Sequence, residues 1–356
     1  MRNPLSVPII KPVNGACNLY CSYCYMHSLL EPQKSKHAVM SLDTLSATID
    51  FFCSHQDEIE FIWHGGEPLL AGKQFYCEVA RKQDKWKARS KKIANFVQTN
   101  GVLVDNEWAR LFAELDFYVG VSLDAPSMVH DKLRVLPDES GSIEKVLKGI
   151  DYLKANGVFN GVSCCVGRWN CHQPEEIIDF FLQHGIYSIK FLRIKAPRKE
   201  AVSANQYADF LIRVFRYWIE IDNPALEIRD VKSVVDLLLG GEFRECTFMG
   251  RCDQFATVYS DGSLFVCDSF LNEPQWHFGS VYEAYSEVLG RDTFQSLLAS
   301  MEQVRKKCYL CRWMPLCNGG CLKDRLSGDG SEVCKANQRI FEEIESSLKQ
   351  YELLAR

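Results

Sequence analysis

The chain has 356 residues, of which 47% are hydrophobic and 24% are charged, and its formal net charge at pH 7 is −5. This length and composition are typical of a soluble globular protein with one large domain and a smaller one. The acidic balance argues against a nucleic-acid partner, which needs a basic surface, and no apolar stretch is long enough to suggest a membrane partner.

The N-terminal segment and the cysteine content together predict where the protein works. Residues Met1–Pro12 lack the apolar core and small-residue cleavage site of a signal peptide. We therefore expect a cytoplasmic protein, in which thiols stay reduced and grouped cysteines bind metal. Five of the sixteen cysteines show no ligand spacing, and we expect them to be small buried hydrophobic side chains: Cys53, Cys77, Cys164, Cys165 and Cys171.

Short apolar runs alternate with amphipathic runs over the first two-thirds of the chain. The predicted strands are Ser6–Lys11, Glu58–Trp63, Ile93–Gln98, Phe117–Leu123, Gly161–Val166 and Ser188–Ile194. The predicted helices are Ser41–His55, Lys73–Arg89, Asn106–Glu114, Ser142–Asn156, Pro174–His184 and Asn205–Glu220. Six strand–helix units predict an α/β fold with a parallel sheet, either doubly wound or a partial barrel. In both forms ligands bind at the carboxyl ends of the strands.

A cysteine triplet directly follows the first predicted strand, so we expect it on that functional edge. It consists of Cys17, Cys21 and Cys24. Three thiolates can hold a four-iron cluster and leave one iron without a protein ligand. A zinc knuckle would instead need a fourth ligand close by, for which His27 is the candidate.

The pattern changes after about Ile228, which predicts a domain of residues 1–228 followed by a domain of residues 229–356 with a C-terminal helix. Val258–Phe265 alternates around Asp261-Gly262, which predicts a β-hairpin. The remainder consists of short helical pieces and cysteine-bearing loops, so bound metal would supply part of its folding energy. Eight cysteines here could hold two fully ligated clusters: Cys246, Cys252, Cys267, Cys308, Cys311, Cys317, Cys321 and Cys334.

The spacing Cys17-x3-Cys21-x2-Cys24, followed by Tyr25, resembles the radical S-adenosylmethionine (radical SAM) superfamily. Trp63-His64-Gly65-Gly66-Glu67-Pro68 resembles the Gly-Gly-Glu-Pro motif of that superfamily. The resemblance implies a partial (β/α)6 TIM-type barrel in which a [4Fe–4S] cluster cleaves S-adenosylmethionine to a radical that abstracts hydrogen from substrate. It also implies the residues that bind this cofactor: Tyr23, Gly65, Gly66, Glu67, Asn100, Ser122 and Arg134.

The seven cysteines from Cys252 to Cys334 resemble the SPASM extension of this superfamily, and Cys246 adds an eighth thiolate. The resemblance implies two auxiliary [4Fe–4S] clusters that carry electrons, hence three clusters in all, with structural zinc as the alternative. The nearer cluster would be held by Cys246, Cys252, Cys267 and Cys321, and the outer one by Cys308, Cys311, Cys317 and Cys334.

Nearly the whole chain is similar to the anaerobic sulfatase-maturating enzymes, including Phe96–Gly101, Gly120–Asp124 and Asp261–Gly279. This similarity implies a peptide or protein substrate, a flavodoxin- or ferredoxin-type reductant, and oxidation of Cys or Ser to formylglycine. It also implies that Asp268 acts as the general base that takes a thiol or hydroxyl proton.

One departure keeps a second reaction open. The sulfatase-maturating enzymes carry glutamine near the substrate where this chain has His64, and Trp63–Pro68 resembles the radical maturases of ribosomal peptides, which form cyclophane or thioether cross-links. Against that class, the chain starts at its first strand without a region for leader-peptide recognition. A third interpretation, a non-catalytic iron–sulfur electron carrier, conflicts with the complete triplet and Gly-Gly-Glu-Pro run.

Overall fold

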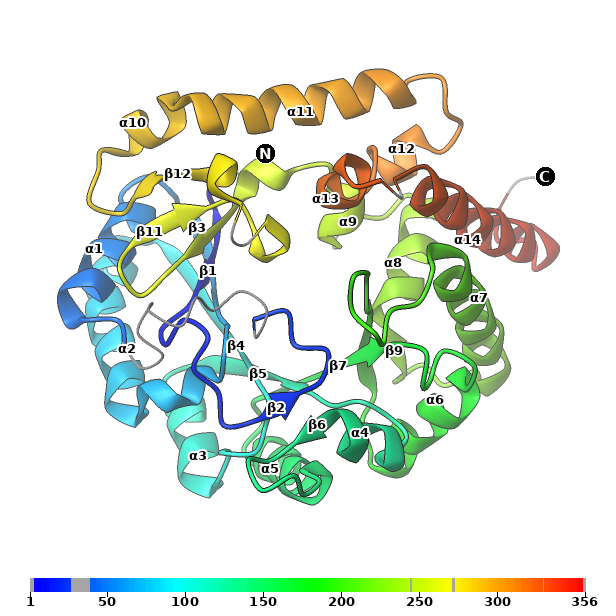
Figure 1. The fold of residues 1–356 in the computed structure, drawn as a ribbon, viewed down its shortest axis with the longest axis horizontal. Helices are drawn as coiled ribbons and strands as arrows, with labels where there is room; N and C mark the ends of the chain where they lie inside the picture. Colours follow the sequence, from blue (N-terminus) through cyan, green and yellow to red (C-terminus); the bar gives the residue numbers. More distant parts are fainter. Residues whose placement is uncertain (1–2, 27–38, 244, 271–272, 329, 355–356) are drawn as a thin grey trace. The chain divides into compact units, whose positions relative to one another are not determined.

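Parallel strands form the framework of the protein, as the alternating pattern predicts (Figure 1). The computed structural model describes residues 3–26, 39–243, 245–270, 273–328 and 330–354. Each of the six predicted strands and six predicted helices is present, with ends that differ from the prediction by two residues at most. Contacts divide the chain into two compact units, and each unit takes segments from distant parts of the sequence.

The first unit comprises Met1–Ser122, Arg134–Asn160 and Arg251–Ala299. Its strands are β1 (Val7–Ile10), β2 (Tyr20–Cys21), β3 (Glu58–Trp63), β4 (Lys92–Thr99), β5 (Phe117–Ser122), β6 (Arg134–Val135), β10 (Phe255–Val258), β11 (Ser263–Phe265) and β12 (His277–Ser280). Its helices include α1 (Leu42–Cys53), α2 (Lys73–Lys87), α3 (Asn106–Glu114), α5 (Ile143–Ala155) and α10 (Tyr285–Gly290). Short 3-10 helices are η1 (Pro68–Ala71), η2 (Cys252–Gln254), η3 (Asp268–Phe270) and η4 (Pro274–Trp276).

The main sheet of this unit has the strand order β12-β11-β10-β1-β3-β4-β5. The pairs from β10 to β5 are parallel, whereas β11 and β12 are antiparallel to their neighbours. Ile10 aligns with Trp63 on one side and with Val258 on the other. The residues that follow, Lys11 and His64, therefore leave the sheet side by side at its carboxyl edge.

The predicted hairpin is confirmed, and it belongs to the sheet of the first unit. Val258 pairs with Leu264, and the Tyr259 N–H donates to the Ser263 carbonyl at 3.1 Å. Because β10 also pairs in parallel with β1, it covers an edge that would otherwise expose unpaired backbone groups. The predicted domain boundary after residue 228 stays a prediction, since both compact units take residues from either side of it.

An aromatic core fixes the strands of the first unit against their helices. Trp63, on β3, packs edge-to-face on Phe75 and Tyr76 of α2, with ring centroids 5.9 and 6.1 Å apart. Its indole N–H donates to Asn95 at 3.0 Å, so this buried polar group is satisfied. At the start of α1, Ser41 accepts the Thr44 N–H at 3.0 Å, an N-cap that sets where the helix begins.

The second unit comprises Leu123–Leu133, Gly161–Gly250 and Ser300–Arg356. It holds the parallel strands β7 (Phe159–Val166, which begins two residues before the unit), β8 (Ser188–Arg193) and β9 (Glu227–Ile228). Its helices are α4 (Ser127–Leu133), α6 (Pro174–Gln183), α7 (Ala204–Ile221), α8 (Arg229–Leu238), α9 (Cys246–Met249), α12 (Met314–Cys317), α13 (Leu322–Leu326) and α14 (Gly330–Gln350). Helix α11 (Asp292–Cys308) begins in the first unit and ends in the second.

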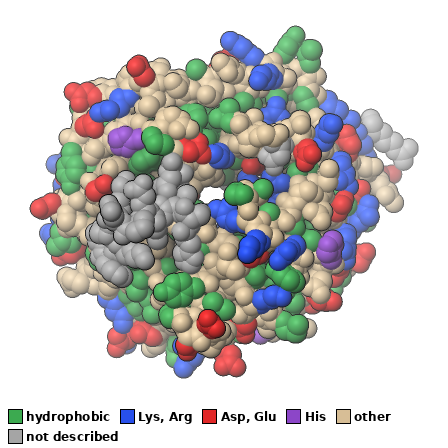
Figure 2. Space-filling view, viewed as in Figure 1, with side chains coloured by type: hydrophobic (Ala, Val, Ile, Leu, Met, Phe, Trp, Pro, Cys, Tyr) green, Lys and Arg blue, Asp and Glu red, His purple; other side chains and the backbone are tan. Residues whose placement is uncertain are grey.

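The long helix α14 packs on α7 and α8, so it belongs to the helical layer of the second unit (Figure 1). The face of the molecule in Figure 2 intersperses acidic and basic side chains. In the part of the chain that the structure describes, none of the helices has the length and apolarity needed to span a lipid bilayer.

Candidate active site

The cysteine triplet lies on a loop of the first unit that pairs with another segment of the unit through a short strand. Strand β2 pairs with β6, so Cys21 aligns with Arg134 and Tyr20 with Val135. The Cys24 N–H donates to the Cys21 carbonyl at 3.1 Å, which closes the loop between these two cysteines. All three cysteines are partly exposed, so their thiols are within reach of a bound group.

Asn100 connects the triplet to the end of β4. Its side-chain amide donates to the Asn18 carbonyl oxygen at 2.8 Å and to the Cys17 Sγ at 3.7 Å. Such N–H···S contacts are a common means of tuning a cysteine-held cluster. Asn100 therefore lies beside the triplet, and its predicted contact with a cofactor stays a prediction.

Glu67 is a fully buried carboxylate that ties the Gly-Gly-Glu-Pro turn to the end of β4. Its oxygens accept the Asn100 N–H at 2.8 Å, the Leu69 N–H at 3.0 Å and the Thr99 hydroxyl at 2.8 Å. Burial raises its pKa to about 7, although these three donors act in the opposite direction. Within the described residues, this carboxylate therefore positions the turn.

Each of the two glycines of the turn is required for a different steric reason. A Cβ on Gly66, whose φ is +54°, would lie 2.1 Å from the Ala16 carbonyl oxygen, so this glycine lets the turn approach the cysteine loop. A Cβ on Gly65, whose φ is +107°, would lie 2.8 Å from both Cγ and Nζ of Lys11. Gly65 thus leaves the space through which the Lys11 side chain passes.

The remaining predicted cofactor residues lie in the same unit. The Arg134 guanidinium lies over the Tyr23 ring at 5.4 Å, and both side chains are buried. At the end of β5, the Ser122 hydroxyl accepts the Gln98 amide N–H at 3.0 Å. The structure therefore brings Tyr23, Arg134 and Ser122 into the unit that carries the triplet, and their cofactor contacts stay predictions.

The donor set of the triplet suits a thiophilic metal cluster. Burial, then Glu67, raises the pKa of the Cys17 thiol to about 11, so this thiol needs a bound cation to become a thiolate at neutral pH. Among the described side chains, no three Cys, His, Asp or Glu groups are already arranged as metal ligands. His27, the alternative fourth ligand of a zinc site, lies outside the described residues.

Asp268 forms the centre of a polar cluster at the carboxyl edge of the sheet. Oδ2 accepts hydrogen bonds from Tyr25 Oη at 3.0 Å and from His64 Nδ1 at 2.9 Å. Oδ1 accepts the Thr257 hydroxyl at 3.2 Å and forms an ion pair with Lys11 Nζ at 3.0 Å. The two predicted residues Asp268 and His64 are therefore in direct contact.

The electrostatics of this cluster keep Asp268 ionised. Burial alone would raise its pKa, but Lys11 and His64 outweigh burial and hold the pKa well below its usual range. Burial and the neighbouring Asp268 raise the pKa of Tyr25, so its phenol stays protonated. The cluster thus contains an ammonium and a carboxylate that neutralise each other, together with a phenol and an imidazole.

The sequence analysis assigned no role to Lys11 or Thr257, although both belong to this cluster. Lys11 has no exposed side-chain area and Thr257 is also buried. A signal for Lys11 was present: it is a charged residue at the end of an apolar strand, where a buried cation needs a partner. Thr257 gave no comparable signal, because threonine is ordinary in a strand.

The C-terminal cysteines of the second unit gather around one pocket. The pocket is lined by Cys308, Cys311, Cys317, Cys321 and Cys334. Burial, followed by the neighbouring thiols Cys334, Cys308 and Cys311, raises the pKa of Cys317 to about 12. Gln338 donates to the Sγ atoms of Cys311 and Cys334 at 3.7 Å each. The pocket thus contains the four cysteines predicted for the outer cluster together with Cys321, which was predicted for the nearer one, and the division between two clusters stays a prediction.

The cysteines predicted for the nearer cluster divide between the compact units. Cys246 and Cys321 belong to the second unit, where burial, followed by the neighbouring Cys321 thiol, raises the pKa of Cys246. Cys252 and Cys267 belong to the first unit. Of the five cysteines without ligand spacing, Cys53, Cys164 and Cys171 are buried as expected, whereas Cys77 and Cys165 are partly exposed.

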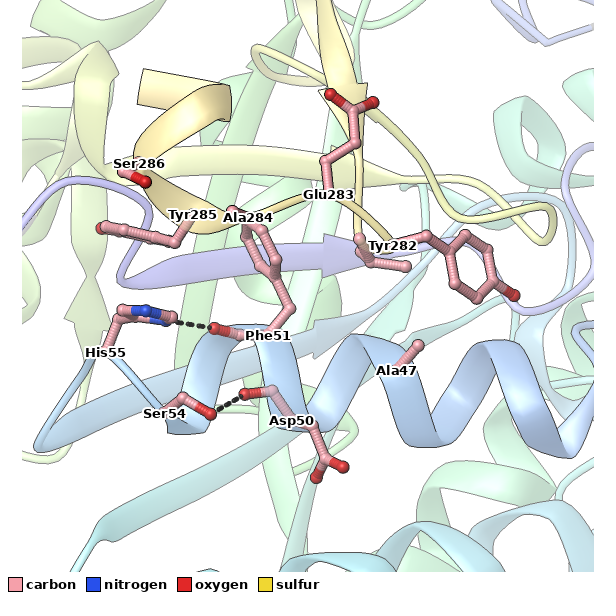
Figure 3. A pocket seen from close by; sticks show the side chains of 11 residues that line it. Ala47, Asp50, Phe51, Ser54, His55, Tyr282, Glu283, Ala284, Tyr285 and Ser286 are labelled. Atoms are coloured by element: carbon pink, nitrogen blue, oxygen red, sulfur yellow. Dashed lines mark hydrogen bonds between the residues drawn. The ribbon is translucent and has the colours of Figure 1, made fainter. Parts of the chain in front are cut away.

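A separate groove on the first unit lies between α1 and the segment after β12 (Figure 3). The His55 and Tyr285 rings stack there with centroids 4.2 Å apart, and the Tyr285 hydroxyl donates to the Pro4 carbonyl at 2.7 Å. These contacts join the end of α1 to the segment before β1, at the amino edge of the strands. The groove shares no residue with the Asp268 cluster, and its stacked rings serve packing.

Residues 12–181 match the family model described as the radical SAM superfamily. The chain is 30% identical to the serine-type anaerobic sulfatase-maturating enzyme of Bacteroides thetaiotaomicron, over 96% of this chain and 89% of that protein. It is 28% identical to the cysteine-type anaerobic sulfatase-maturating enzyme of Clostridium perfringens, over 95% of this chain and 96% of that protein. The chain therefore belongs to the family of the anaerobic sulfatase-maturating enzymes, within the radical SAM superfamily.

Solved structures agree with this family. Native anSMEcpe with bound AdoMet and the Cp18Cys peptide superposes with a TM-score of 0.86 at 26% identity, covering 97% of this chain and 98% of that chain. Streptococcus suis SuiB bound to its precursor peptide SuiA superposes with a TM-score of 0.64 at 17% identity, over 89% of this chain and 72% of that chain. The second similarity concerns the fold alone. The α/β fold with a mostly parallel sheet is thus confirmed.

Proposed function

We propose that this protein oxidises a side chain of a peptide or protein by two electrons and converts Cys or Ser to formylglycine. The Asp268 cluster is the observation that carries this proposal. It provides a proton-accepting group at the carboxyl edge of the sheet whose neighbouring loop bears the triplet. The relatives named above as cysteine-type and serine-type sulfatase-maturating enzymes support the choice of reaction.

The residues of the first unit fit an iron–sulfur cluster and AdoMet. Cys17, Cys21 and Cys24 would hold the cluster, and the predicted cofactor residues surround the same loop. When bound, this pair of cofactors supplies a 5′-deoxyadenosyl radical that removes a hydrogen atom from the substrate side chain. Asn100 and Glu67 hold the loop and the glycine turn in position, while the Asp268–His64 pair takes the proton that leaves the substrate.

The finer architecture is part of the same proposal. The first strands would form a partial (β/α)6 barrel, and the cysteine-rich C-terminal region would be a SPASM extension with two auxiliary [4Fe–4S] clusters. The gathering of Cys308, Cys311, Cys317 and Cys334 supports the outer of these clusters. A flavodoxin- or ferredoxin-type protein would supply the electron that starts each turnover.

The test is mass analysis of a Cys-x-Pro-x-Arg peptide after anaerobic incubation with reconstituted enzyme, AdoMet and reductant. We expect the mass change of a thiol replaced by an aldehyde, together with 5′-deoxyadenosine. Reconstitution should yield about twelve irons per chain if all three clusters are present. A protein that bound iron without forming 5′-deoxyadenosine would instead be an electron carrier, and the proposal would fail.

A cross-linking reaction on a small ribosomal peptide is the second candidate. It is favoured by His64, which stands where the sulfatase-maturating enzymes carry glutamine. An unmodified sulfatase-type peptide, with 5′-deoxyadenosine still accumulating, would support it. A short precursor peptide encoded beside this chain would then be the substrate to assay for loss of two hydrogens.

A further inference from the structure

We propose that three segments of the second unit bind an acidic stretch of the substrate polypeptide, apart from the residue that is modified. The segments follow β5, β7 and β8, and their cationic side chains form what we call the basic cluster: Lys132, Arg168, Arg198 and Lys199. This inference rests on the proposed function, because it names the kind of peptide that the enzyme would prefer. It concerns recognition and gives these residues no part in the chemistry.

Buried hydrogen bonds hold the three segments together. The Asn170 side-chain amide donates to the carbonyls of Ala125 at 3.2 Å and Cys165 at 3.0 Å, so it joins the segment after β5 to the end of β7. The Arg168 N–H donates to the Glu200 carbonyl at 2.9 Å, which joins the segments after β7 and β8. The cationic side chains are therefore carried by loops with a fixed arrangement, as in many binding sites.

Trp169 holds two of the cations against one aromatic ring. The Lys132 ammonium lies 3.4 Å and the Arg168 guanidinium 4.6 Å from the centroid of that ring. All three side chains are exposed, as is Lys199 on the segment after β8, whereas Arg198 is partly exposed. Contact with the ring orients the two charges without neutralising them.

The basic cluster has no counter-ions of its own. Within the described part of the chain, none of its four cations pairs with a carboxylate. Residues 161–173 and 188–199 contain no Asp or Glu, although the whole chain has a net charge of −5. By contrast, Lys195 in the same region pairs with Asp324 at 2.5 Å. Because cations gathered in this way repel one another, the surface favours an anionic partner.

The position and composition of the basic cluster favour a peptide substrate as that partner. In α/β sheets and barrels, substrates bind outside the carboxyl ends of the strands, and the cluster follows such ends. Aromatic and arginine side chains are enriched in protein interfaces, and clustered arginines recognise acidic motifs. The basic run on α2 differs, since Arg81 pairs there with Glu78 at 2.8 Å and Lys85 with Asp50 at 2.6 Å.

The test compares two peptides that share Cys-x-Pro-x-Arg and carry either four glutamates or four glutamines on each side of it. With dithionite as reductant at about 50 mM salt, we expect a KM about tenfold lower for the acidic peptide and a similar kcat, the size of a few exposed ion pairs. In Lys132→Gln/Arg168→Gln/Lys199→Gln, the ratio of the two KM values should fall below about twofold. An unchanged ratio in this variant would overturn the proposal.

Lys82→Gln/Lys87→Gln/Arg89→Gln is the matched control. It removes the same kinds of charge at the end of α2, where Arg89 also lies over a tryptophan ring, that of Trp86, at 5.1 Å. This control should keep the tenfold ratio. Repeating the assay with flavodoxin in place of dithionite separates the substrate from the reductant. If the basic-cluster variant slowed turnover only with flavodoxin and kept the KM ratio, the surface would bind the reductant and the proposal would fail.

A binding measurement makes the inference independent of turnover. Calorimetry with reconstituted enzyme and no reductant should show the acidic peptide binding about tenfold more weakly to the basic-cluster variant, with the neutral peptide unaffected. If the unaltered enzyme modifies neither peptide, the proposed function fails, and the calorimetry still decides whether these segments bind an acidic chain. Equal affinity of the two proteins for the acidic peptide would refute the assignment.

Discussion

The two cysteine-bearing regions of this protein are held in place by different means. In the first unit, the triplet loop is fixed by backbone pairing between β2 and β6 and by the side chains of Asn100 and Glu67. In the second unit, Cys308 ends the long helix α11, Cys317 ends the short helix α12 and Cys334 lies in the long helix α14, and these cysteines line one pocket. The difference teaches that hydrogen bonds and strand pairing already hold the first site, whereas under the proposed function bound metal would complete the second.

The largest expected effect concerns the cysteine triplet of the first unit. Cys24→Ala should abolish 5′-deoxyadenosine formation, because two thiolates cannot hold a cluster that leaves one iron open. The auxiliary sites should be unaffected, so bound iron should fall by only about one third. Cys77→Ala, at a partly exposed cysteine without ligand spacing, is the control and should keep full activity. Residual 5′-deoxyadenosine in Cys24→Ala would show that the triplet is misassigned.

Removal of iron should separate the two regions next. After anaerobic chelation, we expect residues 308–334 to become sensitive to protease, while the strands of the first unit keep their hydrogen-exchange protection. The reason is that burial and hydrogen bonds stabilise the first region without metal, whereas the short helices α12 and α13 bury few side chains. Equal loss of protection in both regions would contradict the comparison.

Glu67→Gln tests the hydrogen bonds that hold the glycine turn beside the triplet. The new side chain has one oxygen and one NH2 group where Glu67 has two oxygens. The NH2 group would face either the Asn100 N–H, or the Leu69 N–H together with the Thr99 hydroxyl, and donors would then meet donors. We therefore expect a loss of about 2 kcal/mol in the free energy of unfolding. Glu114→Gln, on the exposed surface, should change it little. Denaturant-induced unfolding under anaerobic conditions measures both. A neutral result would mean that Glu67 does not hold the turn.

The same residue predicts a dependence on pH. Burial on folding raises the pKa of Glu67 from its ordinary value of 4.5 to about 7, so the folded protein binds its proton more tightly than the unfolded chain does. The contribution is fully present below about pH 4.5 and is lost as the pH rises through about 7. The unfolding free energy of Glu67→Gln should lack this decline. An identical pH dependence in the variant would refute this attribution.

The smallest expected effect lies in the cysteine-bearing region of the second unit. Gln338→Ala removes N–H donors from the sulfurs of Cys311 and Cys334, and donors to sulfur stabilise the reduced cluster. We therefore expect the potential of one auxiliary cluster to become more negative, with bound iron unchanged. Gln350→Ala, an exposed position on the same helix, is the control. An unaltered potential in Gln338→Ala would show that these contacts do not tune a cluster.

The regular part of the fold could be predicted because its signals are local. Six strands and six helices follow from apolar periodicity, and the hairpin follows from Asp261-Gly262. The position of that hairpin could not be predicted, because β10 pairs with β1 across more than two hundred residues and no local pattern encodes such a partner.

The site was predictable to a similar extent. The triplet and the glycine turn are local motifs, and their placement on one edge follows from parallel strands. The role of Glu67 as an internal acceptor depends on Thr99 and Asn100, which lie on another strand end. Likewise, the contact between His64 and Asp268 arises only after the sheet has formed, so the sequence named both residues without joining them.

The ion pair between Lys11 and Asp268 sets a limit on dividing this enzyme into parts. A shortened chain that ended before β10 would keep the cysteine triplet and most of the parallel strands of the first unit. It would also keep a completely buried ammonium whose counter-ion had been deleted, which is among the most destabilising changes a core can suffer. Engineers who want the catalytic half alone would need to replace Lys11 by an apolar side chain.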